Sequence, residues 1–173
     1  MKTLLEHETV KTSLYDTDFY SWTQEQAALL RQVPQGAFEL DVENLVEEIE
    51  SMGRSEVREV SSLIRQILIH LVKLVSVPDS PSRMHWLGEV INFQVDAQQT
   101  FTPSMKQRIE LERVWHSARN TVTNLLRSAE LHVPALPATC PLSLDELLAV
   151  DFDLGKMMKR METALEAASR SPM

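Results

Sequence analysis

Apolar residues recur at helical spacing along most of this chain, and this periodicity limits the possible folds more than any other feature. The widest apolar stripe lies between residues 57 and 75. Its members follow the i, i+3, i+4, i+7 spacing of one helix face. They are Val57, Val60, Leu63, Ile64, Ile67, Leu68, Leu71, Leu74 and Val75. No segment alternates convincingly between apolar and polar residues, as a half-buried strand does. The pattern therefore predicts an all-α fold, with this stripe on a central helix.

Prolines, glycines and capping residues divide the pattern into separate helices. Asp41 is a suitable N-cap, Gly53 is a plausible C-terminal stop, and Ser143 with Glu146 is a capping box. Ser80 and Thr102 each precede a proline, a pair typical of a helix start. The expected helices cover residues 17–32, 41–53, 54–77, 81–101, 103–131, a short stretch after residue 143, and 153–169.

The chain of 173 residues is long enough to bury one substantial core. Short connections between long helices favour antiparallel neighbours. We therefore expect a single-domain bundle of about six or seven helices over residues 14–152, followed by an amphipathic helix and tail over residues 153–173.

Charge and cysteine content exclude several classes of protein. The formal net charge is −8 and the pI is near 5.1, which disfavours binding to nucleic acid or to anionic membranes. Cys140 is the only cysteine, so no internal disulfide is possible, as is usual in a reducing compartment. The N-terminus has no apolar stretch of signal-peptide length. These features predict a cytoplasmic protein that binds neither nucleic acid nor membrane.

Four sequence blocks together resemble a known family. They read DFYSWTQEQAALLR, DVENLVEEIESMGRSE, ILIHLVKL and CPLSLDELLAVDF, and the resemblance covers roughly residues 14–152. The chain is similar to the bacterial family catalogued only as domain of unknown function number 29. The resemblance implies a small, all-helical cytoplasmic protein, and it implies no activity, substrate or catalytic residue.

The acidic helix that begins near Asp41 offers one candidate metal site. Glu43, Glu47 and Glu50 share one helix face at i, i+4 and i+7. Carboxylates one turn apart can approach a hard divalent cation. His70 is the best available imidazole, and it would reach the glutamates if the chain folded back at Gly53. This arrangement would suit a metal-assisted hydrolase or nuclease.

The alternative interpretation of the same acids is a solvated helix face. Runs of charge usually face water and form salt bridges. Arg54, Arg58 and Arg65 are the nearest candidate partners in the sequence. On this interpretation the chain binds no metal and needs no cofactor.

A second candidate site is a cleft between helices. Gln26 and Gln94 each fall inside an apolar stripe, and a buried amide without a hydrogen bond costs about 1–3 kcal/mol. Each could fix the packing of its helix, or the two could line a small-ligand pocket together with Trp22 and Trp86.

Nucleophilic and cofactor motifs give little support for an enzyme. Cys140 lies between prolines, and a reactive thiol needs a cationic neighbour or a helix N-terminus to lower its pKa. The chain has no glycine-rich phosphate loop, no Gly-x-Ser-x-Gly and no zinc pattern. We assign no catalytic residue.

The last helix carries a candidate interaction face. Met157, Met158, Met161 and Leu165 fall on one side of it, and methionines suit adaptable contact surfaces. The face would pack either on the chain's own bundle or on another protein or a second copy. The function predicted from the whole sequence is a non-catalytic interaction module that self-associates, with the metal enzyme and the small-ligand binder as alternatives.

Overall fold

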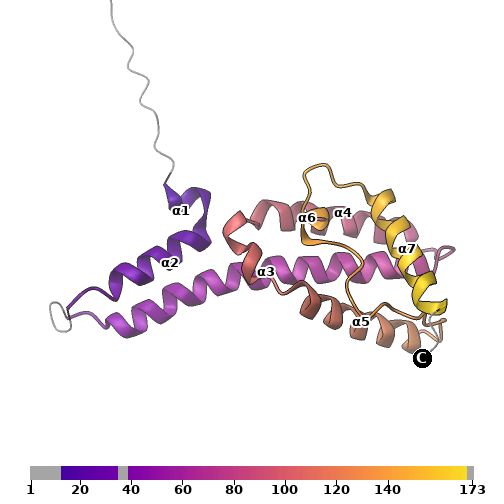
Figure 1. Ribbon diagram of the computed structural model, residues 1–173, viewed down its shortest axis with the longest axis horizontal. Coiled ribbons are helices and arrows are strands. Elements are labelled where there is room, and N and C mark those ends of the chain that lie inside the picture. Colours follow the sequence, from indigo (N-terminus) through magenta and orange to yellow (C-terminus); the bar gives the residue numbers. More distant parts are fainter. Residues whose placement is uncertain (1–12, 35–38, 171–173) are drawn as a thin grey trace, which may run out of the picture. The chain divides into compact units, whose positions relative to one another are not determined.

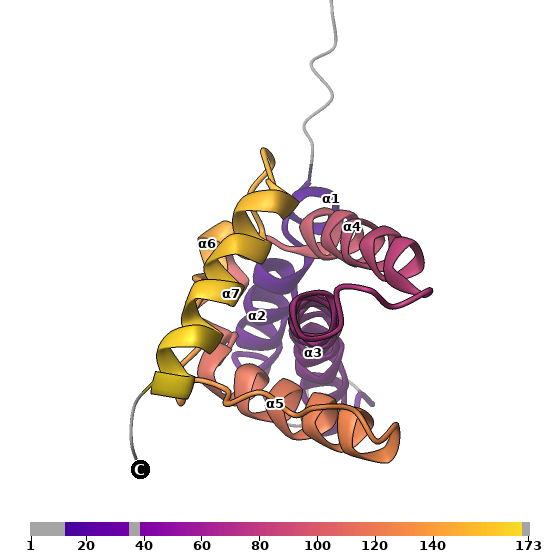
Figure 2. The ribbon, with the colours of Figure 1, turned by 90° about the vertical axis from the view of Figure 1, so that its right-hand side faces the viewer.

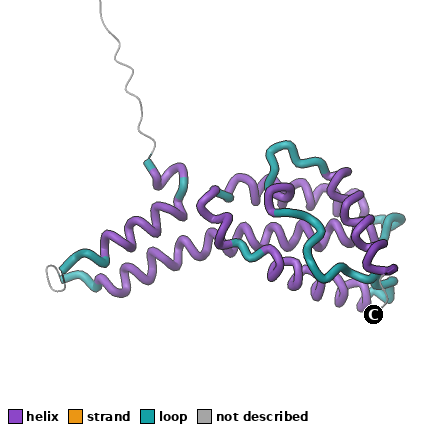
Figure 3. The backbone as a smooth tube through the Cα atoms, viewed as in Figure 1, coloured by secondary structure: helices purple, strands orange, loops and turns teal. Residues whose placement is uncertain are grey.

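The computed structural model describes residues 13–34 and 39–170. Over these residues all regular secondary structure is helical, which confirms the predicted fold class (Figure 3). The helices are α1 (Leu14–Thr17), α2 (Phe19–Leu30), α3 (Val42–Ser76), α4 (Arg83–Thr100), the 3₁₀-helix η1 (Pro103–Arg108), α5 (Leu111–Ser128), α6 (Leu144–Leu147) and α7 (Leu154–Arg170).

Contacts between Cα atoms divide the chain into two compact units, Met1–Arg54 and Ser55–Met173, and each is described by itself. The single bundle over residues 14–152 and the separate segment 153–173 stay predictions. Residues 1–12, where the sequence predicts no signal peptide, and residues 171–173 of the C-terminal segment lie outside the described residues.

In the first unit, Asp18 separates α1 from α2, and α2 corresponds to the helix predicted over residues 17–32. The Asp18 carboxylate accepts a 2.9 Å hydrogen bond from the backbone N–H of Ser21 and so caps α2. The predicted cap, Thr17, instead ends α1, because its hydroxyl donates backwards to the carbonyl oxygen of Ser13 at 3.1 Å. The helix predicted from residue 17 therefore begins after Asp18, and the short helix α1 before it was not predicted.

Helix α2 packs antiparallel to the first part of α3 (Figure 1). The closest approach is at Gly53, where an added Cβ would lie 2.3 Å from the Thr23 hydroxyl oxygen. Thr23 is fully buried, and its hydroxyl donates to the carbonyl oxygen of Tyr20 at 2.7 Å. Glycine is thus required at position 53 by contact with α2.

The prediction that Gly53 ends a helix was wrong, because α3 runs through it from Val42 to Ser76. A glycine inside a helix costs about 1 kcal/mol relative to alanine. The close packing on α2 offsets this cost. The start of the helix was predicted correctly, since the Asp41 carboxylate accepts a 3.2 Å hydrogen bond from the N–H of Asn44.

In the second unit, the remaining part of α3 is the centre of the core. Helices α4, α5 and α7 lie around it (Figure 2). Its fully buried side chains include Val60, Ile64, Ile67, Leu68, Leu71 and Val72. The apolar stripe predicted for this segment therefore faces three other helices.

Of the two proline-marked helix starts, that at Pro81 is a turn, and that at Pro103 begins a 3₁₀-helix instead of a long α-helix. Helix α4 begins at Arg83 and not at Pro81, because the Ser80 hydroxyl oxygen accepts from the N–H of Ser82 at 3.2 Å and forms a turn there. The long helix predicted from residue 103 is η1 followed by α5. Between them Ile109 has an extended backbone, with φ −85° and ψ 106°, and its side chain is buried.

The proline-rich segment after α5 is irregular but held in place by side chains of α5. Trp115 donates from its indole N–H to the carbonyl oxygen of Pro137 at 3.0 Å. Arg119 donates to the carbonyl oxygen of Ala138 at 3.2 Å. These bonds satisfy backbone groups that no helix or strand satisfies.

The predicted capping box at the start of α6 is present. The Ser143 hydroxyl oxygen accepts from the N–H of Glu146 at 3.3 Å, and the Glu146 carboxylate accepts from the N–H of Ser143 at 3.0 Å. The same carboxylate also pairs with Arg160 of α7. Glu146 thus connects the cap of one helix to another helix.

Within the described residues, no helix is both long enough and apolar enough to span a membrane.

Candidate functional site

The acidic face of α3 forms salt bridges in the first unit. Glu47 lies 2.6 Å from Arg54 and Glu50 lies 2.5 Å from Arg31, measured between carboxylate oxygen and guanidinium nitrogen. Glu43 is exposed. Two of the three glutamates predicted as metal ligands are thus paired with arginine, and of the predicted partners only Arg54 takes part.

His70 occupies a half-buried position on α3 in the second unit. Its Nδ1 lies 2.9 Å from the carbonyl oxygen of Gln66, and its ring centre lies 5.7 Å from that of Phe93. Burial lowers the pKa of His70 and so favours the neutral imidazole. Among the described residues, no three His, Cys, Asp or Glu side chains are grouped so that they could hold a metal ion. A metal site formed by His70 and the acidic face stays a prediction.

The cleft residues of the first unit belong to an aromatic cluster. Trp22 stacks on Phe19 with ring centres 5.5 Å apart, and Tyr15 meets its ring edge-on at 4.8 Å. Gln26 is half-buried one turn further along α2. This cluster accounts for the position of Trp22 without a ligand.

The cleft residues of the second unit also have partners within the chain. Gln94 is only 6% exposed, and its amide donates to the carbonyl oxygen of Ala149 at 2.9 Å. The Lys73 ammonium lies 4.2 Å from the centre of the Trp86 ring, a cation–π contact. A ligand cleft formed by all four predicted residues stays a prediction.

The methionine face of α7 is largely covered within the second unit. Met157, Met161 and Leu165 are buried, and Met158 is half-buried. The sequence left open whether this face packs on the chain's own bundle or on another protein. In the structure it packs on the chain itself.

Helix α4 instead presents an apolar face to solvent, which the sequence analysis missed. Met84 is 77% exposed, Ile91 49% and Val95 40%. They share one face with Gly88, where an added Cβ would meet no atom within 4 Å. We call these four residues the α4 stripe. Apolar residues occur all round α4, so the sequence does not indicate which of its sides faces solvent.

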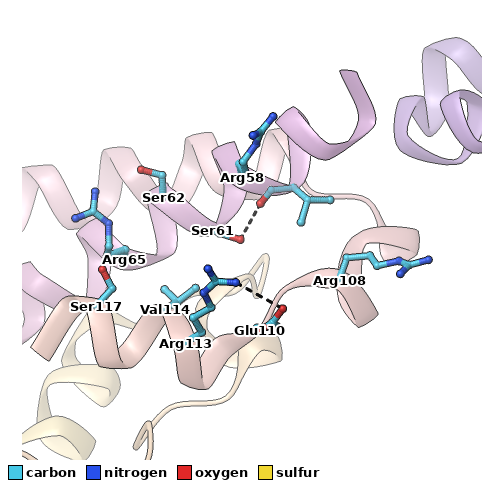
Figure 4. Close-up of a pocket in the computed structure, with 10 residues that line it drawn as sticks. Arg58, Ser61, Ser62, Arg65, Arg108, Glu110, Arg113, Val114 and Ser117 are labelled. Carbon is cyan, nitrogen blue, oxygen red and sulfur yellow. Dashed lines mark hydrogen bonds and ion pairs between the residues drawn. The ribbon is translucent and has the colours of Figure 1, made fainter. Parts of the chain in front are cut away.

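A hollow of about 400 Å³ lies between α3 and α5 in the second unit (Figure 4). We call it the arginine pocket. Its lining residues are Val57, Arg58, Ser61, Ser62, Arg65, Arg108, Glu110, Arg113, Val114 and Ser117. Figure 4 shows Arg113 reaching from α5 towards α3. The sequence analysis had assigned two of these arginines to the acidic face and so did not find the pocket.

Most of the positive charge of the arginine pocket is not neutralised within the described part of the chain. Arg113 lies 4.0 Å from the Glu110 carboxylate, and both side chains are largely exposed. Arg58 donates to the Ser55 hydroxyl at 3.0 Å. No carboxylate among the described residues forms a salt bridge with Arg58, Arg65 or Arg108. The arrangement is suited to bind an anion.

Cys140 is not arranged as a nucleophile. Burial raises the pKa of its thiol to about 11. Its backbone N–H donates to the Glu112 carboxylate at 3.1 Å, which places a negative charge nearby. The thiol therefore stays protonated at neutral pH.

Comparisons with known proteins give the family of the chain and a structure with a similar fold. The family described as Domain of unknown function DUF29 matches residues 14–153. A crystal structure of an α-helical protein of unknown function from Rhodospirillum rubrum is similar, with 33% sequence identity and a TM-score of 0.78. The similarity covers 87% of this chain and 99% of that one. No curated protein matches the chain.

Proposed function

This chain belongs to the DUF29 family, and from that premise we propose that it is a non-catalytic cytoplasmic interaction module that self-associates. The observation that carries the proposal is the α4 stripe. A contiguous exposed apolar surface commonly marks a site of protein contact. The positions 84, 88, 91 and 95 also repeat at intervals of four, three and four residues, the spacing at which two helices pack along a seam.

Charge favours a second copy as the partner on this face. The chain carries a formal net charge of −8, so two copies repel each other over most of their surfaces. The α4 stripe contains no charged residue, and Gly88 leaves room for a partner side chain at its middle. Packing one stripe on another therefore buries apolar surface without bringing like charges into direct contact.

The test is sedimentation velocity over an about hundredfold range of protein concentration, since self-association follows mass action. We expect the wild type to shift from monomer to dimer and Ile91→Glu to stay monomeric. Leu125→Glu is the matched control, because Leu125 is 50% exposed on α5 and lies outside the α4 stripe. It should associate like the wild type. A wild type that stays monomeric throughout would refute the proposal.

The two other functions predicted from the sequence have no specific observation in their favour. The metal-assisted hydrolase or nuclease is tested by metal analysis of the purified protein and of Glu47→Ala. Stoichiometric metal that disappears in the variant would favour that enzyme over the interaction module.

A further inference from the structure

The arginine pocket concentrates positive charge in a chain whose formal net charge is −8. We propose that it binds a small phosphorylated molecule. The proposal is independent of self-association, because α3, η1 and α5 supply the lining residues and α4 supplies none.

The arginines that line the pocket carry more charge than its one carboxylate neutralises. Glu110 is the only acidic residue in the lining, and its contact with Arg113 is long and exposed, so it contributes little stability. Arg65 and Arg108 have no salt bridge to any carboxylate among the described residues. Clustered positive charge on a concave surface raises the local concentration of anions. The pocket therefore attracts an anionic ligand.

The hydrogen-bond donors of the pocket are guanidinium and hydroxyl groups on both of its walls. A guanidinium carries five N–H donors in a planar fork that matches the oxygens of phosphate or carboxylate. Arg113 reaches from α5 towards α3, and Arg65 stands on the α3 side of the hollow. Ser62 and Ser117 add exposed hydroxyls. A phosphate accepts hydrogen bonds on more oxygens than a carboxylate, so donors on two walls fit phosphate better.

The volume of the hollow is suited to a small molecule. A hollow of about 400 Å³ falls within the about 300–1,000 Å³ of small-molecule sites. Arg58 and Arg65 lie two helical turns apart, about 10 Å along α3, so a ligand with two phosphate groups can engage both arginines. Val57 and Val114 offer apolar contact beside them. Nucleic acid would need a wider basic surface, with about 6–10 phosphate contacts.

The experiment uses pyrophosphate as the probe, titrated into the full chain by isothermal calorimetry at low salt. Arg65→Gln and Arg113→Gln each remove charge-assisted hydrogen bonds, so each should weaken binding about tenfold or more. Arg127→Gln is the matched control, because Arg127 is exposed on α5 outside the pocket. Glu110→Gln removes the competing carboxylate and should tighten binding by about threefold.

The pattern of these four variants decides the proposal. Weaker binding in both pocket variants, unchanged binding in Arg127→Gln and tighter binding in Glu110→Gln would support it. Absence of pyrophosphate binding at millimolar concentration, or equal binding by all variants, would overturn it. Citrate bound more tightly than pyrophosphate would overturn the assignment to phosphate. Thermal unfolding by circular dichroism identifies any variant that fails to fold, and the second arginine variant then supplies the comparison.

Discussion

Replacement of Gly53 by alanine should destabilise the protein although alanine is the better helix former. The new methyl group would lie 2.3 Å from the Thr23 hydroxyl oxygen and 3.3 Å from the Thr23 Cβ. Thr23 is buried and branched at Cβ, so its side chain has few alternative rotamers. The clash must be relieved by moving α2 or by rotating the threonine.

The magnitude follows from opposing effects. Alanine in place of glycine stabilises a helix by about 1 kcal/mol. Overpacking of a close contact costs about 1–3 kcal/mol. Rotation of Thr23 would break its 2.7 Å hydrogen bond to Tyr20 and leave a buried hydroxyl unsatisfied, at a further cost of about 1–3 kcal/mol. Together these terms lower the free energy of unfolding of Gly53→Ala by about 1–5 kcal/mol.

Urea unfolding followed by circular dichroism measures this change. Gly88→Ala is the matched control, because a Cβ at Gly88 meets nothing within 4 Å; it should stabilise the monomer by about 1 kcal/mol. Both are measured at a concentration where sedimentation finds monomer. In the background of Thr23→Ala the hydroxyl is gone, and Gly53→Ala should become nearly neutral. Equal effects of Gly53→Ala with and without Thr23 would refute the steric explanation.

Three further predictions concern single side chains. At pH 8, Cys140 should react with iodoacetamide far more slowly in the folded protein than in the urea-unfolded protein. The reason is that a thiol of pKa about 11 is only about 0.1% ionised at pH 8. Intact-mass measurement follows the reaction. His70 has a lowered pKa in the folded state, so the unfolded state binds its proton first and the free energy of unfolding should fall as the pH drops through 6.5. His70→Asn should reduce this slope in urea titrations at several pH values, and an unchanged slope would contradict the assignment. Gln94→Leu should lower the free energy of unfolding by about 1 kcal/mol, because the carbonyl of Ala149 loses its donor; urea unfolding with no loss would contradict this.

The parts of the fold that depend on local signals were predictable from the sequence. The helical class and the core side of α3 follow from the spacing of apolar residues, which needs no knowledge of neighbours. The capping box of Ser143 and Glu146 depends on contacts within one turn. Gly53 was misplaced for the opposite reason, because its role depends on the approach of α2. The exposed face of α4 was missed because apolar residues occur on all sides of that helix, so their spacing does not show which side meets the core.

The arginine pocket could not be predicted because its residues come from separate elements. Arg58 and Arg65 occur seven residues apart on one helix face, and that spacing was a usable signal. The nearby glutamates made salt bridges the simpler interpretation. Only the packing of α5 against α3 brings Arg113 to the same hollow, and that packing is a long-range property of the chain.

The Glu146 carboxylate takes part in two contacts, the capping box of α6 and the ion pair with Arg160 of α7. Both contacts therefore depend on whether this one group carries a proton. Its hydrogen bonds to Ser143, with the charge of Arg160 as a further contribution, lower the pKa of Glu146. The resulting stabilisation is present above the ordinary carboxyl pKa and is lost as the pH falls towards the lowered value. Protonation would remove the carboxylate half of the capping box of α6 and the ion pair with α7 together. Both contacts should therefore be lost in acid over the same pH range, with a single midpoint.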